Sequence, residues 1–155
     1  MKLSDIIVTD ATITDIEAVT RDACIEQLVG ALADAGAISK RSVKEATAAV
    51  LARENQATTG IGKGISLPHA KIKSVKKVVG TIGRSTKGID FNALDSRPVY
   101  VVILLLSNPE NPDEHLQAME TIFKHVQRDI FRRFLRQCET PEAVAELIEE
   151  ADELA

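Results

Sequence analysis

The sequence has no tryptophan, one tyrosine and four phenylalanines, so that only 3% of its residues are aromatic. Proteins that bind single-stranded nucleic acid stack the bases on aromatic side chains, and this chain has few of them to offer. Its formal net charge of −4 is also opposite in sign to the basic surfaces that attract a phosphate backbone. We therefore expect no nucleic-acid partner.

Only two cysteines and three histidines are present. Cys24 and Cys138 lie too far apart in the sequence to suggest a disulfide framework, and we expect both to be small buried hydrophobic side chains in a reducing cytoplasm. The histidines are scattered and have none of the spacings typical of metal ligands. The sequence therefore predicts no metal and no other cofactor.

Long hydrophobic runs are also missing. The longest stretch of apolar residues covers 99–106, whereas a helix that crosses a bilayer needs about 20 residues. Asp5 and Asp10 stand where a signal peptide would be apolar. These features predict a soluble, unprocessed, cytoplasmic protein that does not insert into a membrane.

The charged residues are unevenly distributed along the chain. Seven basic residues and no acidic one lie within 55–89, whereas seven acidic residues and no basic one follow from Glu139 to the end. Runs of one sign usually form solvated faces of a protein. The more specific interpretation is that the central basic segment binds a small anion.

The length of 155 residues is typical of one domain, which we expect to span 1–155. Thr20 is predicted to cap a helix that stops at Gly36. A second helix is predicted to begin at Ser39 or Ser42 and to run to about Glu54.

Strands are predicted at the short apolar runs 65–67, 78–82 and 99–106. The last of these is apolar throughout, which indicates burial on both faces and therefore helices on both sides of the sheet. Further helical segments are predicted from Asn111–Pro112, over about 130–135, and from Thr140–Pro141. The expected fold is α/β (α+β), a three-layer sandwich in which a mixed β-sheet is flanked by helices on both faces.

The helix that begins at Pro112 is predicted to bury an apolar stripe formed by Leu116, Met119, Phe123 and Val126. His125 lies away from this stripe, so we expect it to be exposed and inert. His115 falls within about 40° of Met119 and Val126 at about 100° per residue, so it is expected to face the sheet. A hydrogen-bonded core histidine is the plain alternative for His115.

His69 is different, because it follows Pro68 at the end of a short predicted strand, in a stretch without acidic residues. With an ordinary pKa of about 6.5, a histidine at neutral pH keeps a lone pair on one ring nitrogen while the other nitrogen donates a hydrogen bond. Such a side chain can attack phosphorus. The alternative is a turn histidine without a role.

Phosphoryl transfer to a histidine requires groups that stabilise the negative charge on the phosphoryl oxygens. Arg53, at the end of the second predicted helix, can bind two oxygens at once. Gly60, Gly62 and Gly64 could bring backbone N–H groups to the same oxygens. These glycines match neither G-x-x-x-x-G-K-[ST] nor G-x-G-x-x-G, so a nucleotide-binding domain is the weaker hypothesis.

The segment TGIGKGISLPHA at 59–70 resembles the enzyme IIA domains of the bacterial phosphotransferase system, mannitol/fructose type, including the nitrogen-regulatory branch. The family pattern runs from an acidic or amide residue, here Glu54, through Ile61–Gly62 to an apolar-Ala-apolar-Pro-His core. Ser66 stands where alanine is usual, and a hydroxyl there could alter hydrogen bonding to His69. The resemblance extends over about 15–148.

The resemblance implies that His69 is the phosphoryl acceptor, and that Arg53 and His115, sixteen residues before it and forty-six after it, stabilise the phosphoryl oxygens. It implies a phosphohistidine carrier of the HPr type as donor, and either an enzyme IIB cysteine or a regulated partner protein as acceptor. The Thr-Gly-Ile-Gly-x-Gly-Ile form favours the regulatory branch. A non-catalytic regulatory binding module of the same fold is the alternative function.

Overall fold

A long strand, β5 (Val99–Ser107), runs through the centre of the sheet in the computed structural model, which describes residues 1–154. Strand β4 (Val79–Ile89) pairs with it in antiparallel fashion along one edge. The two short strands β2 (Ile65–Ser66) and β3 (His69–Lys71) both pair with it in parallel, one after the other along its opposite edge. Strand β1 (Gly60–Gly62) adds to β2 as an antiparallel hairpin.

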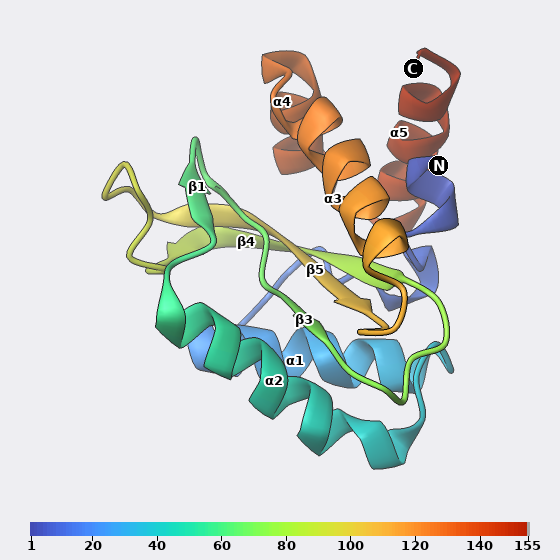
Figure 1. The fold of residues 1–155 in the computed structure, drawn as a ribbon. Coiled ribbons are helices and arrows are strands. Elements are labelled where there is room, and N and C mark those ends of the chain that lie inside the picture. Colours follow the sequence, from blue (N-terminus) through green and yellow to red (C-terminus); the bar gives the residue numbers. More distant parts are fainter. Residues whose placement is uncertain (155) are drawn as a thin grey trace.

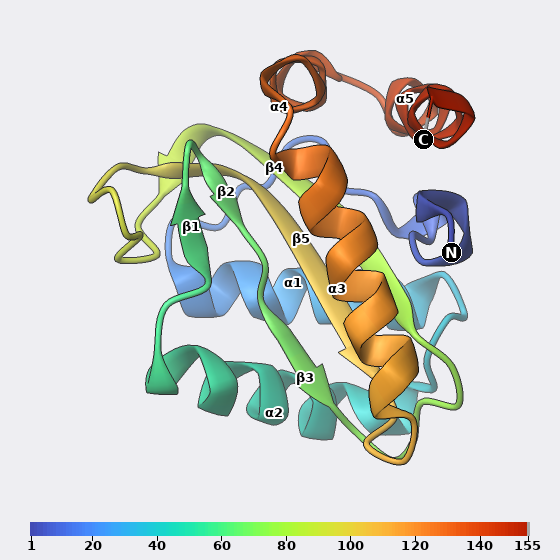
Figure 2. The same cartoon turned by 45° about the horizontal axis from the view of Figure 1, so that its top comes forward.

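Helices cover both faces of this sheet (Figures 1 and 2). Helices α1 (Arg21–Asp34) and α2 (Val43–Gln56) lie on one face. The other face carries α3 (Pro112–Val126), α4 (Asp129–Gln137) and α5 (Pro141–Leu154), and three short 3-10 turns complete the structure: Leu3–Asp5, Thr9–Ala11 and Lys40–Ser42. The predicted three-layer α/β arrangement is therefore present.

Strand β5 separates two hydrophobic cores, because its successive side chains point to opposite faces of the sheet. Val102, Leu104 and Leu106 belong to the core beneath α1 and α2, whereas Val101, Ile103 and Leu105 belong to the core beneath α3, α4 and α5. Every one of these side chains is buried. The prediction of a strand covered on both faces is confirmed.

The predicted helix caps at Thr20 and Asn111 are formed. The Thr20 hydroxyl accepts a hydrogen bond from the backbone of Ala23, and the Asn111 side chain accepts one from Glu114, with Pro112 as the first helical residue. Helix α2 begins differently, because the Ser42 hydroxyl bonds to that of Ser39 instead of to the helix backbone.

Two predictions for α3 were wrong. His125 is buried, with 1% of its surface exposed, and its ring centroid lies 5.5 Å from that of Phe131 in α4. Leu116 is instead 57% exposed. His125 is buried because α4 packs over the end of α3 and covers this side chain. Leu116 is exposed because it lies about 160° around the helix from the fully buried Ala118.

Both cysteines are free and buried, as predicted. Cys24 lies in one core and Cys138 in the other. Burial raises the pKa of the Cys24 thiol to about 12, so that this side chain behaves as a small hydrophobic group. Within residues 1–154, no helix is long and apolar enough to cross a membrane.

Glycine substitutions in β4 and α1 test the packing of the sheet. A Cβ atom at Gly80 would lie 2.8 Å from the backbone oxygen of Leu104, whereas one at Gly30 in α1 would meet nothing within 4 Å. We expect Gly80→Ala to lower the free energy of unfolding by about 1–3 kcal/mol. The control Gly30→Ala should raise it by about 0.5–1 kcal/mol, because alanine favours the helix. Urea denaturation of both variants measures this, and equal effects would contradict the packing described.

Candidate active site

A cleft of about 480 Å³ opens where β3, α2 and the first turn of α3 meet. It brings together the three side chains that the sequence singled out, Arg53 from α2, His69 from β3 and His115 from α3. These residues lie far apart along the chain, and the fold alone places them in one cleft. The remaining lining residues are Ala49, Ala52, Gln56, Ala70 and Lys71.

The orientation of His69 is set by its own strand. Its Nδ1 lies 2.6 Å from the carbonyl oxygen of Leu67. A carbonyl oxygen only accepts hydrogen bonds, so Nδ1 carries the proton and donates it. The lone pair is therefore on Nε2. The half-buried imidazole of His69 thus has one nitrogen fixed by the backbone and one nitrogen free to react.

His115 lies beside His69, with the two ring centroids 5.5 Å apart and the ring planes inclined at 48°. Its Nδ1 is hydrogen-bonded to the hydroxyl of Ser107, the buried last residue of β5. Asn111 and Pro112 start α3 immediately before His115, which fixes the histidine in the first turn. The predicted orientation of His115 toward the sheet is confirmed.

Arg53 occupies the last turn of α2, next to a buried carboxylate. One guanidinium nitrogen, Nη1, donates to the carbonyl oxygen of Ala57 at 2.8 Å. The carboxylate of Glu54, only 2% exposed, accepts hydrogen bonds from the backbone N–H and the hydroxyl of Thr59. Glu54 therefore ties the end of α2 to the chain that leads into β1, and Arg53 is held at the edge of the cleft.

Both imidazoles in the cleft are neutral near pH 7. Burial lowers the pKa of His69 below 6.5; the hydrogen bond to Leu67 opposes this shift, and the positive charge of Arg53 adds to it. Burial lowers the pKa of His115 to about 4; the charge that His69 carries once it is protonated at acid pH, and the charge of Lys71, lower it further. A neutral His69 keeps the Nε2 lone pair that a nucleophile requires.

Lys71 is a site residue that the sequence did not single out. It lies two residues after His69 in β3 and lines the same cleft. Its charge lowers the pKa of both His69 and His115. The signal that could have found it is the two-residue spacing, because residues i and i+2 of a strand share one face.

The glycines of the predicted phosphoryl-binding loop and Ser66 lie outside the cleft of His69. Among residues 1–154, none of Gly60, Gly62, Gly64 or Ser66 lines the cleft of His69. A Cβ atom at Gly60 would lie 2.8 Å from that of Ala93, so this glycine permits a close approach of the hairpin to the loop after β4. The Ser66 hydroxyl is buried and makes no hydrogen bond to any residue within 1–154, His69 included. A role of this segment in phosphoryl binding stays a prediction.

Comparisons with a family model and with individual proteins point to the same family. The family described as "Phosphoenolpyruvate-dependent sugar phosphotransferase system, EIIA 2" matches residues 5–151. The fructose-specific EIIA component of Haloferax volcanii is 34% identical, over 94% of this chain and 99% of its own length. A nitrogen regulatory protein of Bradyrhizobium diazoefficiens is 26% identical, over 93% of this chain and 92% of its own length.

Longer proteins and solved structures are also similar. The fructose-specific EIIABC component of Bacillus subtilis is 31% identical over 98% of this chain, which corresponds to 24% of that protein. The crystal structure of nitrogen regulatory protein IIA-Ntr from Neisseria meningitidis superimposes with a TM-score of 0.82 at 24% identity, covering 94% of this chain and 98% of that one. This likeness supports the α/β fold described above.

The lowered histidine pKa values predict a pH dependence of stability. The unfolded chain binds protons on its histidines at about pH 6.5, whereas the folded chain binds one on His115 only near pH 4. The stability linked to neutral His115 is therefore present above pH 6.5 and is lost as the pH falls toward 4. Urea denaturation between these pH values should show the loss, and His115→Gln should make it smaller. Imidazole resonances of His115 that titrate near 6.5 in the folded protein would contradict the assignment.

Proposed function

Because this chain belongs to the EIIA 2 family of the phosphoenolpyruvate-dependent sugar phosphotransferase system, we propose that its His69 accepts a phosphoryl group on Nε2 from a phosphohistidine carrier of the HPr type. The family resemblance predicted from the sequence is confirmed, and the chain is a phosphotransferase component. The observation that carries the proposal for His69 is its free Nε2 in a cleft shared with Arg53, Lys71 and His115.

The proposed transfer needs no acid or base at His69. The Nε2 lone pair forms the new N–P bond while the N–P bond of the carrier breaks, and that electron pair returns to the carrier's imidazole. His69 keeps its proton on Nδ1 and so becomes positively charged. The carbonyl oxygen of Leu67, which already accepts this N–H, stabilises the new charge.

The other lining residues stabilise the dianionic phosphoryl group. Arg53 presents a guanidinium that binds two oxygens at once, and Lys71 supplies a second positive charge. We assign to neutral His115 the tautomer in which the Ser107 hydroxyl donates to Nδ1. Nε2 of His115 then carries the proton and donates it to a phosphoryl oxygen, so Ser107 is a positioning residue for His115.

The relatives suggest two versions of the next step, which differ in the acceptor of the phosphoryl group. Similarity to the fructose-specific EIIA component of Haloferax volcanii supports a sugar-transport relay, for which the expected acceptor is a cysteine of an enzyme IIB. Similarity to the nitrogen regulatory protein of Bradyrhizobium diazoefficiens supports a regulatory output, in which the phosphorylation state controls a bound partner. We expect the exchange to occur in the cytoplasm in both versions, and both share the phosphorylation of His69.

Phosphorylation by an HPr-type donor tests the proposal. Wild-type protein incubated with the phosphorylated donor should gain one acid-labile phosphoryl mass, measured by mass spectrometry of the intact chain. His69→Ala should gain none. Arg53→Ala should slow the gain about 100-fold, because one preorganised group at the developing charge is lost. Arg41→Ala, at an exposed arginine in the turn before α2, is the matched control and should react like wild type.

The same experiment distinguishes the alternatives. A phosphoryl mass that persists in His69→Ala would contradict the assignment of the acceptor. Loss of the phosphoryl mass when a fructose-type IIB is added supports the transport version, and retention of that mass supports the regulatory version. A chain that takes up no phosphoryl group, and whose partners bind wild type, His69→Ala and His69→Asp equally, would be the binding module instead of a phosphocarrier.

The proposed role of Lys71 is tested separately. Lys71→Ala should slow phosphorylation about tenfold, since a charge-assisted contact to the phosphoryl group is lost. The pKa of His115 should rise from about 4, because the charge of Lys71 contributes to its lowering. Lys73→Ala is the control, as Lys73 is exposed in the same segment and does not line the cleft among the residues described. Equal behaviour of the two variants would contradict the role.

A further inference from the structure

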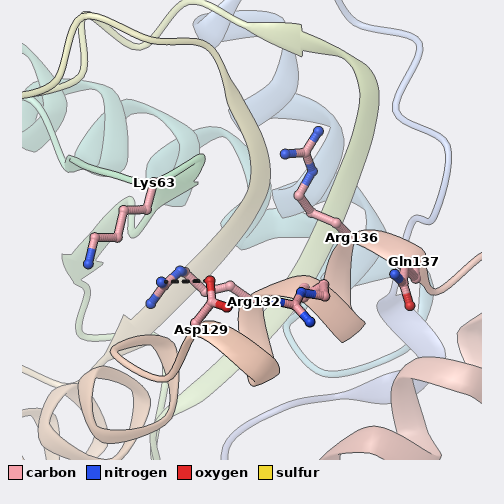
Figure 3. A pocket seen from close by; sticks show the side chains of 6 residues that line it. Lys63, Asp129, Arg132, Arg136 and Gln137 are labelled. Atoms are coloured by element: carbon pink, nitrogen blue, oxygen red, sulfur yellow. Dashed lines mark hydrogen bonds and ion pairs between the residues drawn. The ribbon is translucent and has the colours of Figure 1, made fainter.

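A second cleft, of about 750 Å³, lies between the β1–β2 hairpin and α4 (Figure 3). It shares no lining residue with the cleft of His69 within 1–154. Four positively charged side chains and one carboxylate line it, which gives a formal charge of +3 in a chain whose net charge is −4. The lining residues are Lys63, Asp129, Arg132, Arg133, Arg136 and Gln137.

Arg136 is held in place by contacts that leave its donors free. Its Cζ lies 3.8 Å from the centroid of the Tyr100 ring, so the guanidinium stacks on the aromatic face. Its backbone oxygen accepts a hydrogen bond from Nε of Arg84 at 2.7 Å. No side-chain N–H of Arg136 donates to a residue within 1–154. A stacked guanidinium of this kind presents its edges to an oxyanion.

Asp129 positions the two other arginines without neutralising them. Its carboxylate contacts Nη2 of Arg133 at 2.8 Å and Nη2 of Arg132 at 3.4 Å. Arg132 also donates through Nη1 to the carbonyl oxygen of Val126, and its side chain is only 11% exposed. One carboxylate therefore orders two guanidinium groups, and an excess of positive charge remains.

Lys63 lines the same cleft from the hairpin (Figure 3). Its φ of 59° lies in the left-handed region, where glycine is the usual residue, and it stands between Gly62 and Gly64, which also have positive φ. Its backbone N–H donates to the Asp95 carboxylate at 2.9 Å, which holds the turn. The ammonium group forms no ion pair with a carboxylate among residues 1–154. The hairpin thus presents a lysine at a position where glycine would be less strained.

We propose that this cleft binds a small ligand that carries two or three linked phosphate groups. Its volume of about 750 Å³ is large enough to hold a ligand of this size. Arginine binds phosphate oxygens in pairs, and cations from both α4 and the hairpin meet an anion between them. None of the lining residues within 1–154 is aromatic, so the cleft offers no ring on which a base could stack, and the phosphates are the groups recognised.

Titration of the full chain with inorganic triphosphate, ATP and citrate tests the proposal by calorimetry and by backbone amide shifts. Triphosphate and ATP should bind alike, with dissociation constants below about 1 mM near 0.1 M salt. Arg136→Glu should weaken binding about tenfold or more. Lys63→Gly, which suits the positive φ and so preserves the hairpin, should weaken it as well. Arg41→Glu is the control with the same charge change and should bind like wild type.

The result is separable from the phosphocarrier function. The double variant Arg53→Ala, Lys71→Ala should keep its affinity for triphosphate, and Arg136→Glu should still be phosphorylated at His69. The proposal is overturned if wild type binds no triphosphate, if citrate binds as tightly, or if Arg41→Glu weakens binding as much as Arg136→Glu. Amide shifts concentrated around His69 would also overturn it, because they would assign the anion to the other cleft.

Discussion

The hydrogen bond from Nδ1 of His69 to the carbonyl oxygen of Leu67 determines which ring nitrogen is available for chemistry. The donor and acceptor are two residues apart, with Pro68 between them, and the proline ring restricts the backbone at this point. The sheet holds the same turn from the other side, because Leu105 of β5 donates its N–H to the carbonyl oxygen of Pro68. The reactive tautomer therefore depends on the pairing of β3 with β5 as much as on the histidine itself.

The pairing of these strands also explains why the site assembles from distant residues. Lys71 at the end of β3 pairs with Ser107 at the end of β5, and both strands run in the same direction. The chain leaves β5 and enters α3 within a few residues, which brings His115 over this end of the sheet. Ligand sites of open α/β sheets lie at the carboxyl ends of parallel strands for the same reason.

Features that depend on local sequence could be predicted, and features that depend on packing between elements could not. The Thr20 and Asn111 caps follow from side chains that bond to the backbone three residues away. His125 was misjudged because α4 covers it, and nothing in the periodicity of α3 shows where α4 will pack. Lys71 was missed because the strand that gives it a common face with His69 is only three residues long and forms by pairing with β5.

The positive charge of Arg53 is available to the site because no carboxylate within residues 1–154 forms an ion pair with it. A dianionic phosphoryl group has to be stabilised in a chain that is negatively charged overall. An arginine whose charge is neutralised by an ion pair with a carboxylate would stabilise the phosphoryl group little. Glu54 is adjacent to Arg53, yet its two oxygens are taken by the N–H and hydroxyl of Thr59. No ion pair joins Arg53 to a carboxylate among residues 1–154. The buried carboxylate thus organises the end of α2 while leaving the guanidinium charge for the phosphoryl oxygens.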